Sequence, residues 1–133
     1  MAENSSKCIL VVDDNDDVRR LVKKVLQMSG YQVCEAASGE EALAEVEKAV
    51  PDLILMDIRL PGQFNGLEAT SRLKDDARMQ RVPIVALTAS VLDRDRRQAL
   101  AAGCSGFISK PIYISSLPEL VEKFITRGAM APR

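Results

Sequence analysis

The chain of 133 residues contains no histidine. This absence excludes several classes of protein, because a histidine kinase, a histidine phosphotransfer domain and a Ser-His-Asp or Cys-His hydrolase all need that side chain. Any phosphohistidine chemistry in which the chain takes part must therefore use the histidine of a partner.

Cysteines and long apolar runs are also scarce. Cys8, Cys34 and Cys104 lack the Cys-x-x-Cys or Cys/His spacing of a zinc site, so we expect reduced thiols, most of them buried. No apolar run approaches the roughly 18 residues that a membrane-spanning helix needs, and the polar start Met1–Lys7 leads into no signal-peptide core. We therefore expect a cytoplasmic protein with no membrane partner.

An excess of charge of one sign is missing as well. The 18 basic and 19 acidic side chains leave a formal net charge of −1, which provides no basic surface for direct nucleic-acid binding. The length and the 47% hydrophobic and 28% charged composition indicate one soluble domain. We expect that domain at residues 7–127, between a disordered N-terminus at 1–6 and a flexible tail at 128–133.

Apolar runs alternate with helix-period segments along the chain. Because strands joined by crossover helices run parallel, the alternation predicts a doubly wound α/β domain with a five-stranded parallel sheet. The predicted strands are Lys7–Val12, Gln32–Ala36, Leu53–Met56, Val82–Leu87 and Gly106–Ser109. The predicted helices are Asp16–Ser29, Ser38–Ala49, Leu67–Asp76, Leu92–Ala102 and Leu117–Thr126.

Polar side chains stand at the carboxyl ends of four of these strands: Asp13 with Asp14, then Asp57, Thr88 and Lys110. In an open α/β sheet, ligands bind in the crevice beyond those ends. Crowded carboxylates repel one another, and Mg²⁺, which prefers oxygen ligands, removes the conflict. Singly, each residue has an ordinary explanation as a cap, a strand-ending hydroxyl or a solvated lysine. Together they favour phosphoryl transfer, with Asp57 as nucleophile and Lys110 and Thr88 facing the phosphoryl oxygens.

The stretches ILVVDDN, PDLILMDIRLPG, NGLEAT, VPIVALTA and GFISKPI resemble the receiver domain of two-component response regulators of the CheY-like, single-domain type. The resemblance covers about residues 7–127 and implies the sheet order 2-1-3-4-5. It implies that Asp57 is the phosphoacceptor. It further implies an Mg²⁺ site in which Asp14 and Asp57 bind directly, Asp13 acts largely through water and Arg59 contributes its backbone carbonyl.

The same resemblance implies a two-state switch rather than an enzyme that turns over an external substrate. Lys110 resembles the family's site lysine, followed by a cis bond to Pro111. Thr88 resembles the switch hydroxyl and Phe107 the switch aromatic, although a plain core aromatic stays the other interpretation of Phe107. The implied phosphodonor is a sensor histidine kinase or a histidine phosphotransfer protein. A downstream protein would read the face formed by the fourth helix, fifth strand and fifth helix, with the receiver a monomer or a phosphorylation-dependent dimer.

The chain departs from the family pattern at two places. Pro61 and Gly66 enclose four residues where the family usually has three, so the conformation of this loop is open. Arg59 and Ser90 occupy the positions two after Asp57 and two after Thr88, where the resemblance implies that side chains influence how fast water attacks the phosphate.

Three other functions share parts of this pattern. A haloacid-dehalogenase-type phosphatase needs a second aspartate two residues after its nucleophile, where this chain has Arg59. A flavodoxin-like FMN binder needs a Ser/Thr/Gly phosphate loop after the first strand, where Asp13 and Asp14 would repel phosphate. A phosphorelay intermediate, or a receiver excised from a hybrid histidine kinase, keeps the same chemistry and stays open. The run Arg94, Arg96 and Arg97 is either a partner contact or, more simply, a solvated helix face.

Overall fold

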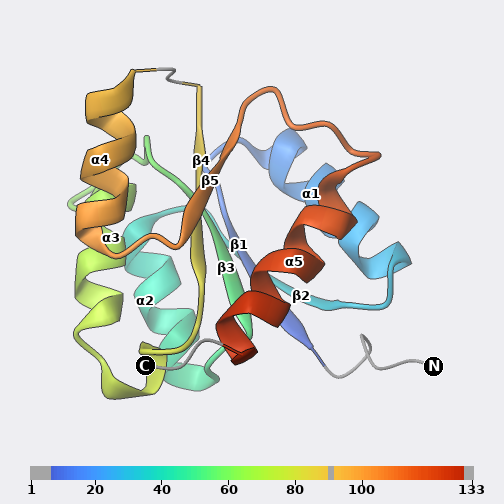
Figure 1. Cartoon of the computed structure of the whole chain (residues 1–133), viewed down its shortest axis with the longest axis horizontal. Helices are drawn as coiled ribbons and strands as arrows, with labels where there is room; N and C mark the ends of the chain where they lie inside the picture. Colours follow the sequence, from blue (N-terminus) through green and yellow to red (C-terminus); the bar gives the residue numbers. More distant parts are fainter. Residues whose placement is uncertain (1–6, 90–91, 131–133) are drawn as a thin grey trace.

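A computed structural model of the chain describes residues 7–89 and 92–130 (Figure 1). The segment 1–6, for which we expected disorder, lies outside the described residues. Five parallel strands form one sheet in the order β2-β1-β3-β4-β5, which confirms the expected doubly wound topology. The strands are β1 Cys8–Val12, β2 Gln32–Ala36, β3 Leu53–Asp57, β4 Ile84–Thr88 and β5 Gly106–Ser109.

Helices cover both faces of the sheet. Helices α2, α3 and α4 lie on one face, and α1 and α5 lie on the other (Figure 1). The α-helices are α1 Asp16–Met28, α2 Gly39–Lys48, α3 Gly66–Lys74, α4 Asp93–Ala102 and α5 Leu117–Met130, with a 3-10 turn η2 at Ala77–Met79.

The central strands are buried on both faces because successive side chains alternate between two apolar layers. Every residue of β3 and β4 is buried, whereas the edge strand β2 alternates between exposed and half-buried positions until Ala36. Leu10, Ile54 and Ile84 pack under α2, α3 and α4, while Ile9, Leu55 and Val85 pack under α1 and α5. This rigid centre carries the ends of β1, β3 and β4.

The two ends of α3 differ from the predicted ones because polar side chains, which the apolar pattern does not register, determine where the helix begins and ends. Helix α3 begins at Gly66 because Asn65 and Glu68 form a reciprocal capping box at its N-terminus. It ends at Lys74, whose Nζ donates to the carbonyls of Met79 and Val82 and so holds the chain in η2.

Helix α5 continues to Met130, beyond Thr126, so the first part of the tail expected at 128–133 is helical. Gly128 does not end it, since one glycine weakens a helix by only about 1 kcal/mol.

The three cysteines are free, but the expectation that most of them are buried is wrong. Cys104 is buried and Cys8 is half-buried, whereas Cys34 is exposed because it lies on the edge strand β2. Among the described residues, no helix is long and apolar enough to cross a membrane.

Candidate functional site

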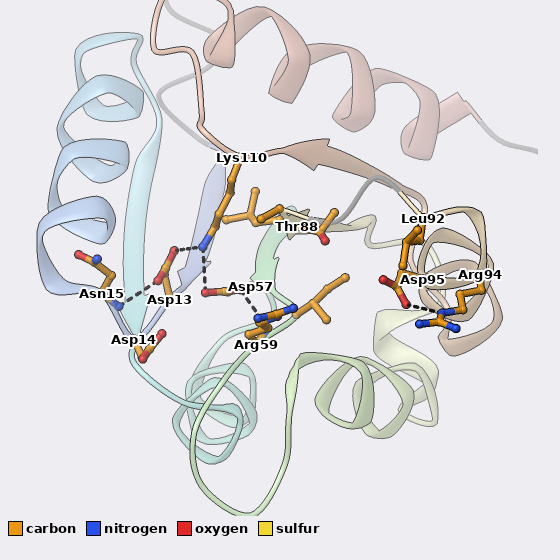
Figure 2. A pocket seen from close by; sticks show the side chains of 13 residues that line it. Asp13, Asp14, Asn15, Asp57, Arg59, Thr88, Leu92, Arg94, Asp95 and Lys110 are labelled. Atoms are coloured by element: carbon orange, nitrogen blue, oxygen red, sulfur yellow. Dashed lines mark hydrogen bonds and ion pairs between the residues drawn. The ribbon is translucent and has the colours of Figure 1, made fainter.

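The sheet register brings the four predicted strand ends to one edge. Val12 pairs with Met56, Asp57 with Leu87, and Thr88 with Ser109, so the residues that follow these pairs emerge side by side. The Lys110 N–H donates to the Thr88 carbonyl at 2.8 Å, which continues the pairing of β4 and β5 by one residue. A cleft of about 830 Å³ lies at this edge, and its lining includes Asp13, Asp14, Asp57, Arg59, Thr88 and Lys110 (Figure 2).

Asp57 is fixed at the end of β3 with only 5% of its surface exposed. One carboxylate oxygen, Oδ1, accepts a hydrogen bond from the Arg59 N–H at 3.0 Å, and Oδ2 lies 3.1 Å from Lys110 Nζ. Burial raises the pKa of Asp57 above its ordinary value; the hydrogen bonds from Arg59 and Lys110 oppose this rise without cancelling it. Both oxygens are therefore oriented, and the carboxylate is poorly hydrated.

Asp13 lies on the other side of Lys110 and is fully buried. Its Oδ1 accepts a hydrogen bond from the Asn15 N–H at 2.9 Å, and its Oδ2 lies 3.4 Å from Lys110 Nζ. Burial by itself lowers the pKa of Lys110, but Asp57 and Asp13 outweigh that effect and raise it, so the ammonium stays charged between the two carboxylates. Figure 2 shows Lys110 reaching down between them.

Asp13, Asp14 and Asp57 form a group of oxygen donors suited to a hard divalent cation. Each offers one carboxylate oxygen, and these oxygens all lie within 4.8 Å of one another. Asp14 is exposed, so a cation can reach the group from solvent. The charge of Lys110 balances only part of the negative charge of the three carboxylates, which is the imbalance that Mg²⁺ with oxygen ligands corrects. The donor set therefore fits the expected metal.

The two predicted switch residues have different surroundings. Thr88 ends β4, is 8% exposed and lines the cleft. Phe107 on β5 is half-buried, packs against the apolar layer beneath α4 and is not among the described residues that line the cleft. The guanidinium of Arg96 on α4 lies over the Phe107 ring, 4.9 Å from its centroid. Arg96 is therefore partly buried against Phe107, whereas Arg94 and Arg97 are exposed to solvent.

Residues 9–122 match the sequence pattern of the response regulator receiver domain. The chain belongs to this family. The receiver is 37% identical over 120 residues to the polar-differentiation response regulator DivK of Brucella ovis, which covers 90% of this chain and 97% of DivK. Receiver domains of this family work in two-component signalling.

Two solved structures show how closely the receiver keeps the family fold. The chemotaxis response regulator CheY4 of Vibrio cholerae superposes with a TM-score of 0.84 at 30% identity, covering 89% of this chain and 98% of that one. The receiver domain of a signal transduction histidine kinase from Syntrophus aciditrophicus gives a TM-score of 0.84 at 27% identity, covering 96% of each chain.

The receiver's longer loop, Pro61 to Gly66, is held against α2. The Gln63 N–H donates to Glu40 Oε2 at 2.8 Å, and Gly62 beside it has a φ of +93°, which favours glycine. The Lys110–Pro111 bond is cis, as expected. Ser90 lies outside the described residues.

Sequence reasoning missed the contribution of Asn15 and Gly66 to the receiver's site. The Asn15 side chain caps α1 while its N–H orients Asp13. A Cβ on Gly66 would overlap the Asp57 carbonyl, so only glycine allows α3 to begin this close to β3. Glycine next to asparagine signals a turn in the sequence, but the close approach to Asp57 exists only in the folded chain.

Proposed function

We propose that this receiver is a phosphorylation-activated signalling switch in a two-component or phosphorelay pathway. Asp57 accepts a phosphoryl group from the phosphohistidine of a sensor histidine kinase or a histidine phosphotransfer protein. The observation that carries the proposal is the Asp57 carboxylate, buried at the end of the central strand β3 and held by Arg59 and Lys110 beside the oxygen cluster.

The transfer needs little besides position and charge. An Asp57 oxygen attacks phosphorus, the P–N bond breaks, the imidazole nitrogen keeps the bonding pair, and an acyl phosphate remains on Asp57. Lys110 neutralises part of the charge on the phosphoryl group, and the Thr88 hydroxyl donates a hydrogen bond to one of the phosphoryl oxygens. Mg²⁺ would be held by Asp14 and Asp57, by the Arg59 carbonyl and, through water, by Asp13. It would supply further positive charge to the phosphoryl oxygens.

The signal leaves through the face formed by α4, β5 and α5. Thr88 moves toward the new phosphoryl oxygens, and the Phe107 ring turns into the space behind it. This turn separates the ring from Arg96, so the α4 surface changes with it. Leu92, which precedes α4, and Leu100 on α4 are 47% and 50% exposed, which supports docking of a downstream protein at this helix.

The proposal is tested by intact-mass analysis after incubation with acetyl phosphate, whose P–O bond breaks to release acetate. We expect one added phosphoryl group that requires Mg²⁺ and is removed by alkali, on the wild type and not on Asp57→Asn. Asp52→Asn serves as the matched control, because Asp52 binds the Cys8 N–H at the other end of the sheet. A wild type that stays unmodified with acetyl phosphate, and with phosphoramidate as a second donor, would refute the acceptor role.

A phosphorelay intermediate is a second candidate, favoured by the likeness to the receiver domain of a histidine kinase. In this role the reverse transfer, from Asp57 to a phosphotransfer histidine, is productive. Radiolabelled phosphorylated receiver mixed with purified histidine phosphotransfer domains would then lose its label to one of them. Release of all the label as inorganic phosphate would favour the terminal switch.

A further inference from the structure

Arg19 makes three hydrogen bonds close to Asp13 and Asp14, which we call the acid pair. It lies in the first turns of α1, and only 12% of its side chain is exposed. Its guanidinium donates to the Asp13 carbonyl oxygen at 2.7 Å, to Asp16 Oδ1 at 2.7 Å and to Glu35 Oε1 at 2.9 Å. These acceptors belong to the β1–α1 loop, the start of α1 and strand β2. Arg19 therefore ties three segments together.

Glu35 holds the guanidinium from the side of the sheet. Its second oxygen, Oε2, accepts a hydrogen bond from Lys23 Nζ at 2.9 Å, so both oxygens are engaged. The Lys23 hydrogen bond, joined by that of Arg19, keeps the pKa of Glu35 below its ordinary value against the effect of burial. Arg19 Nε makes its own hydrogen bond to the other oxygen of this charged carboxylate, and the planar set of donors fixes the orientation of the guanidinium relative to its three acceptors.

The contact that matters for the site is the one with the Asp13 carbonyl. That carbonyl belongs to the planar peptide unit joining Asp13 to Asp14, so its orientation fixes the positions of the Asp14 N and Cα from which the Asp14 side chain departs. The Asp13 N–H is held by the Ala36 carbonyl at 3.1 Å, and Asp13 Oδ1 by the Asn15 N–H. Arg19 completes the set by fixing the peptide plane itself.

We propose that Arg19 is a positioning residue for divalent-cation binding by Asp13 and Asp14. It is not among the described residues that line the cleft, so it acts through the Asp13–Asp14 peptide and not on a ligand. The inference rests on the proposed function only in taking the acid pair as the metal site. Residues that orient metal ligands from behind typically change metal affinity 10–100-fold when removed.

The sign of the effect separates positioning from simple electrostatics. Arg19→Met removes a positive charge near a cation site, and charge alone would therefore tighten Mg²⁺ binding. Loss of positioning does the opposite. Lys23→Met is the matched control, because it removes the same charge from the same Glu35 and leaves the Arg19 contact with Asp13 in place.

The experiment is a calorimetric Mg²⁺ titration of the full chain, with ¹⁵N NMR spectra recorded before metal is added. We expect Arg19→Met to weaken Mg²⁺ binding by roughly tenfold or more. We expect Lys23→Met to bind Mg²⁺ as tightly as the wild type or slightly more tightly. The amide resonances of Asp14 and Asn15 should shift in Arg19→Met. Arg19→Lys, which keeps the charge without the planar set of donors, should recover only part of the affinity.

Each outcome is decisive for Arg19. An Mg²⁺ affinity of folded Arg19→Met equal to or above that of the wild type overturns the proposal, as does an equal loss in Lys23→Met or a wild type that binds no Mg²⁺. If far-UV circular dichroism shows that Arg19→Met is unfolded, Arg19→Lys decides, and wild-type affinity in that variant overturns the proposal. Acetyl phosphate labelling of the wild type is run in parallel. A wild type that binds Mg²⁺ but takes no phosphoryl group refutes the acceptor role of Asp57 while the affinities still test Arg19.

Discussion

Lys110 faces two buried carboxylates, Asp57 at 3.1 Å and Asp13 at 3.4 Å, with the exposed Asp14 close by. A single ammonium cannot balance three carboxylates whose oxygens lie within 4.8 Å of one another. Buried charge that is not fully compensated destabilises a folded protein. The uncompensated charge of this proposed cation site should therefore lower the stability of the fold when no cation is bound.

Removing one of these charges should stabilise the metal-free receiver. We expect Asp57→Asn to raise the free energy of unfolding by about 1 kcal/mol without Mg²⁺, because it relieves the repulsion from Asp13. In saturating Mg²⁺ the order should reverse, since the wild type gains binding free energy that an amide ligand provides poorly. Urea unfolding with and without Mg²⁺ measures both differences. A wild type that is the more stable of the two without metal would contradict this prediction.

Glu35 should make stability depend on pH in the acid range. Its folded pKa lies below the ordinary value of 4.5, chiefly because of the Lys23 hydrogen bond, so its contribution is complete above the unfolded pKa. That contribution is lost as pH falls through the folded pKa. The difference in unfolding free energy between the wild type and Glu35→Gln should therefore be constant near neutral pH and shrink below pH 4.5. Urea unfolding at a series of pH values checks this, and a difference that grows on acidification would contradict it.

At the scale of the elements, the start of α3 is packed closely against the end of β3. Gly66 is the first residue of the helix, and a Cβ there would overlap the backbone of Asp57 and Ile58. Its N–H also donates to the Ile58 carbonyl at 2.9 Å. The backbone at the start of α3 is therefore in direct contact with the backbone at the end of β3, next to Asp57.

Gly66→Ala should consequently damage both stability and the site. We expect a loss of about 2 kcal/mol in the free energy of unfolding, with slower labelling by acetyl phosphate, because the backbone at Asp57 must shift. Gly39→Ala is the matched control: Gly39 is likewise the first residue of a helix, but a Cβ there would lie 3.2 Å from its nearest neighbours. Urea unfolding and labelling rates compare the two variants. If both substitutions changed the unfolding free energy and the labelling rate equally, the close approach of Gly66 to Asp57 would not be the cause.

At the scale of the whole molecule, the sheet order decides which strands are protected from solvent. The order places β1, β3 and β4 in the interior and leaves β2 and β5 at the edges. A sheet in chain order would instead put β1 at an edge. The three interior strands have hydrogen-bonded neighbours on both sides, and two of them carry the acid pair and Asp57.

Hydrogen exchange tests this arrangement. We expect amides of β1, β3 and β4 to exchange at least about tenfold more slowly than those of β2 and β5, because they open only with the core. Exchange followed by mass spectrometry of peptides from each strand provides the measurement. Exchange of β1 at the rate of the edge strand β2 would contradict the order found here.

Patterns local to the chain were enough to predict the five strands, the five helices and the polar residues at the ends of four of the strands. Burial on both faces leaves continuous apolar runs, and a helix leaves a stripe with its own period, so neighbouring residues carry this information. Resemblance to the receiver family added the sheet order and the cis Lys110–Pro111 bond, both confirmed. The roles of Asp57, Thr88, Phe107 and the metal ligands stay predictions.

Only the tertiary structure decided which distant groups meet. Lys110 contacts Asp13 across 97 residues of sequence, and Arg19 reaches Glu35 on a different element. No local period encodes such pairs, because they depend on how helices pack on the sheet. The same reason explains why Cys34 is exposed, why Arg96 covers Phe107 and why Gly66 must be glycine. Each of these facts is a property of two segments brought together, and a pattern in one segment carries no record of the other.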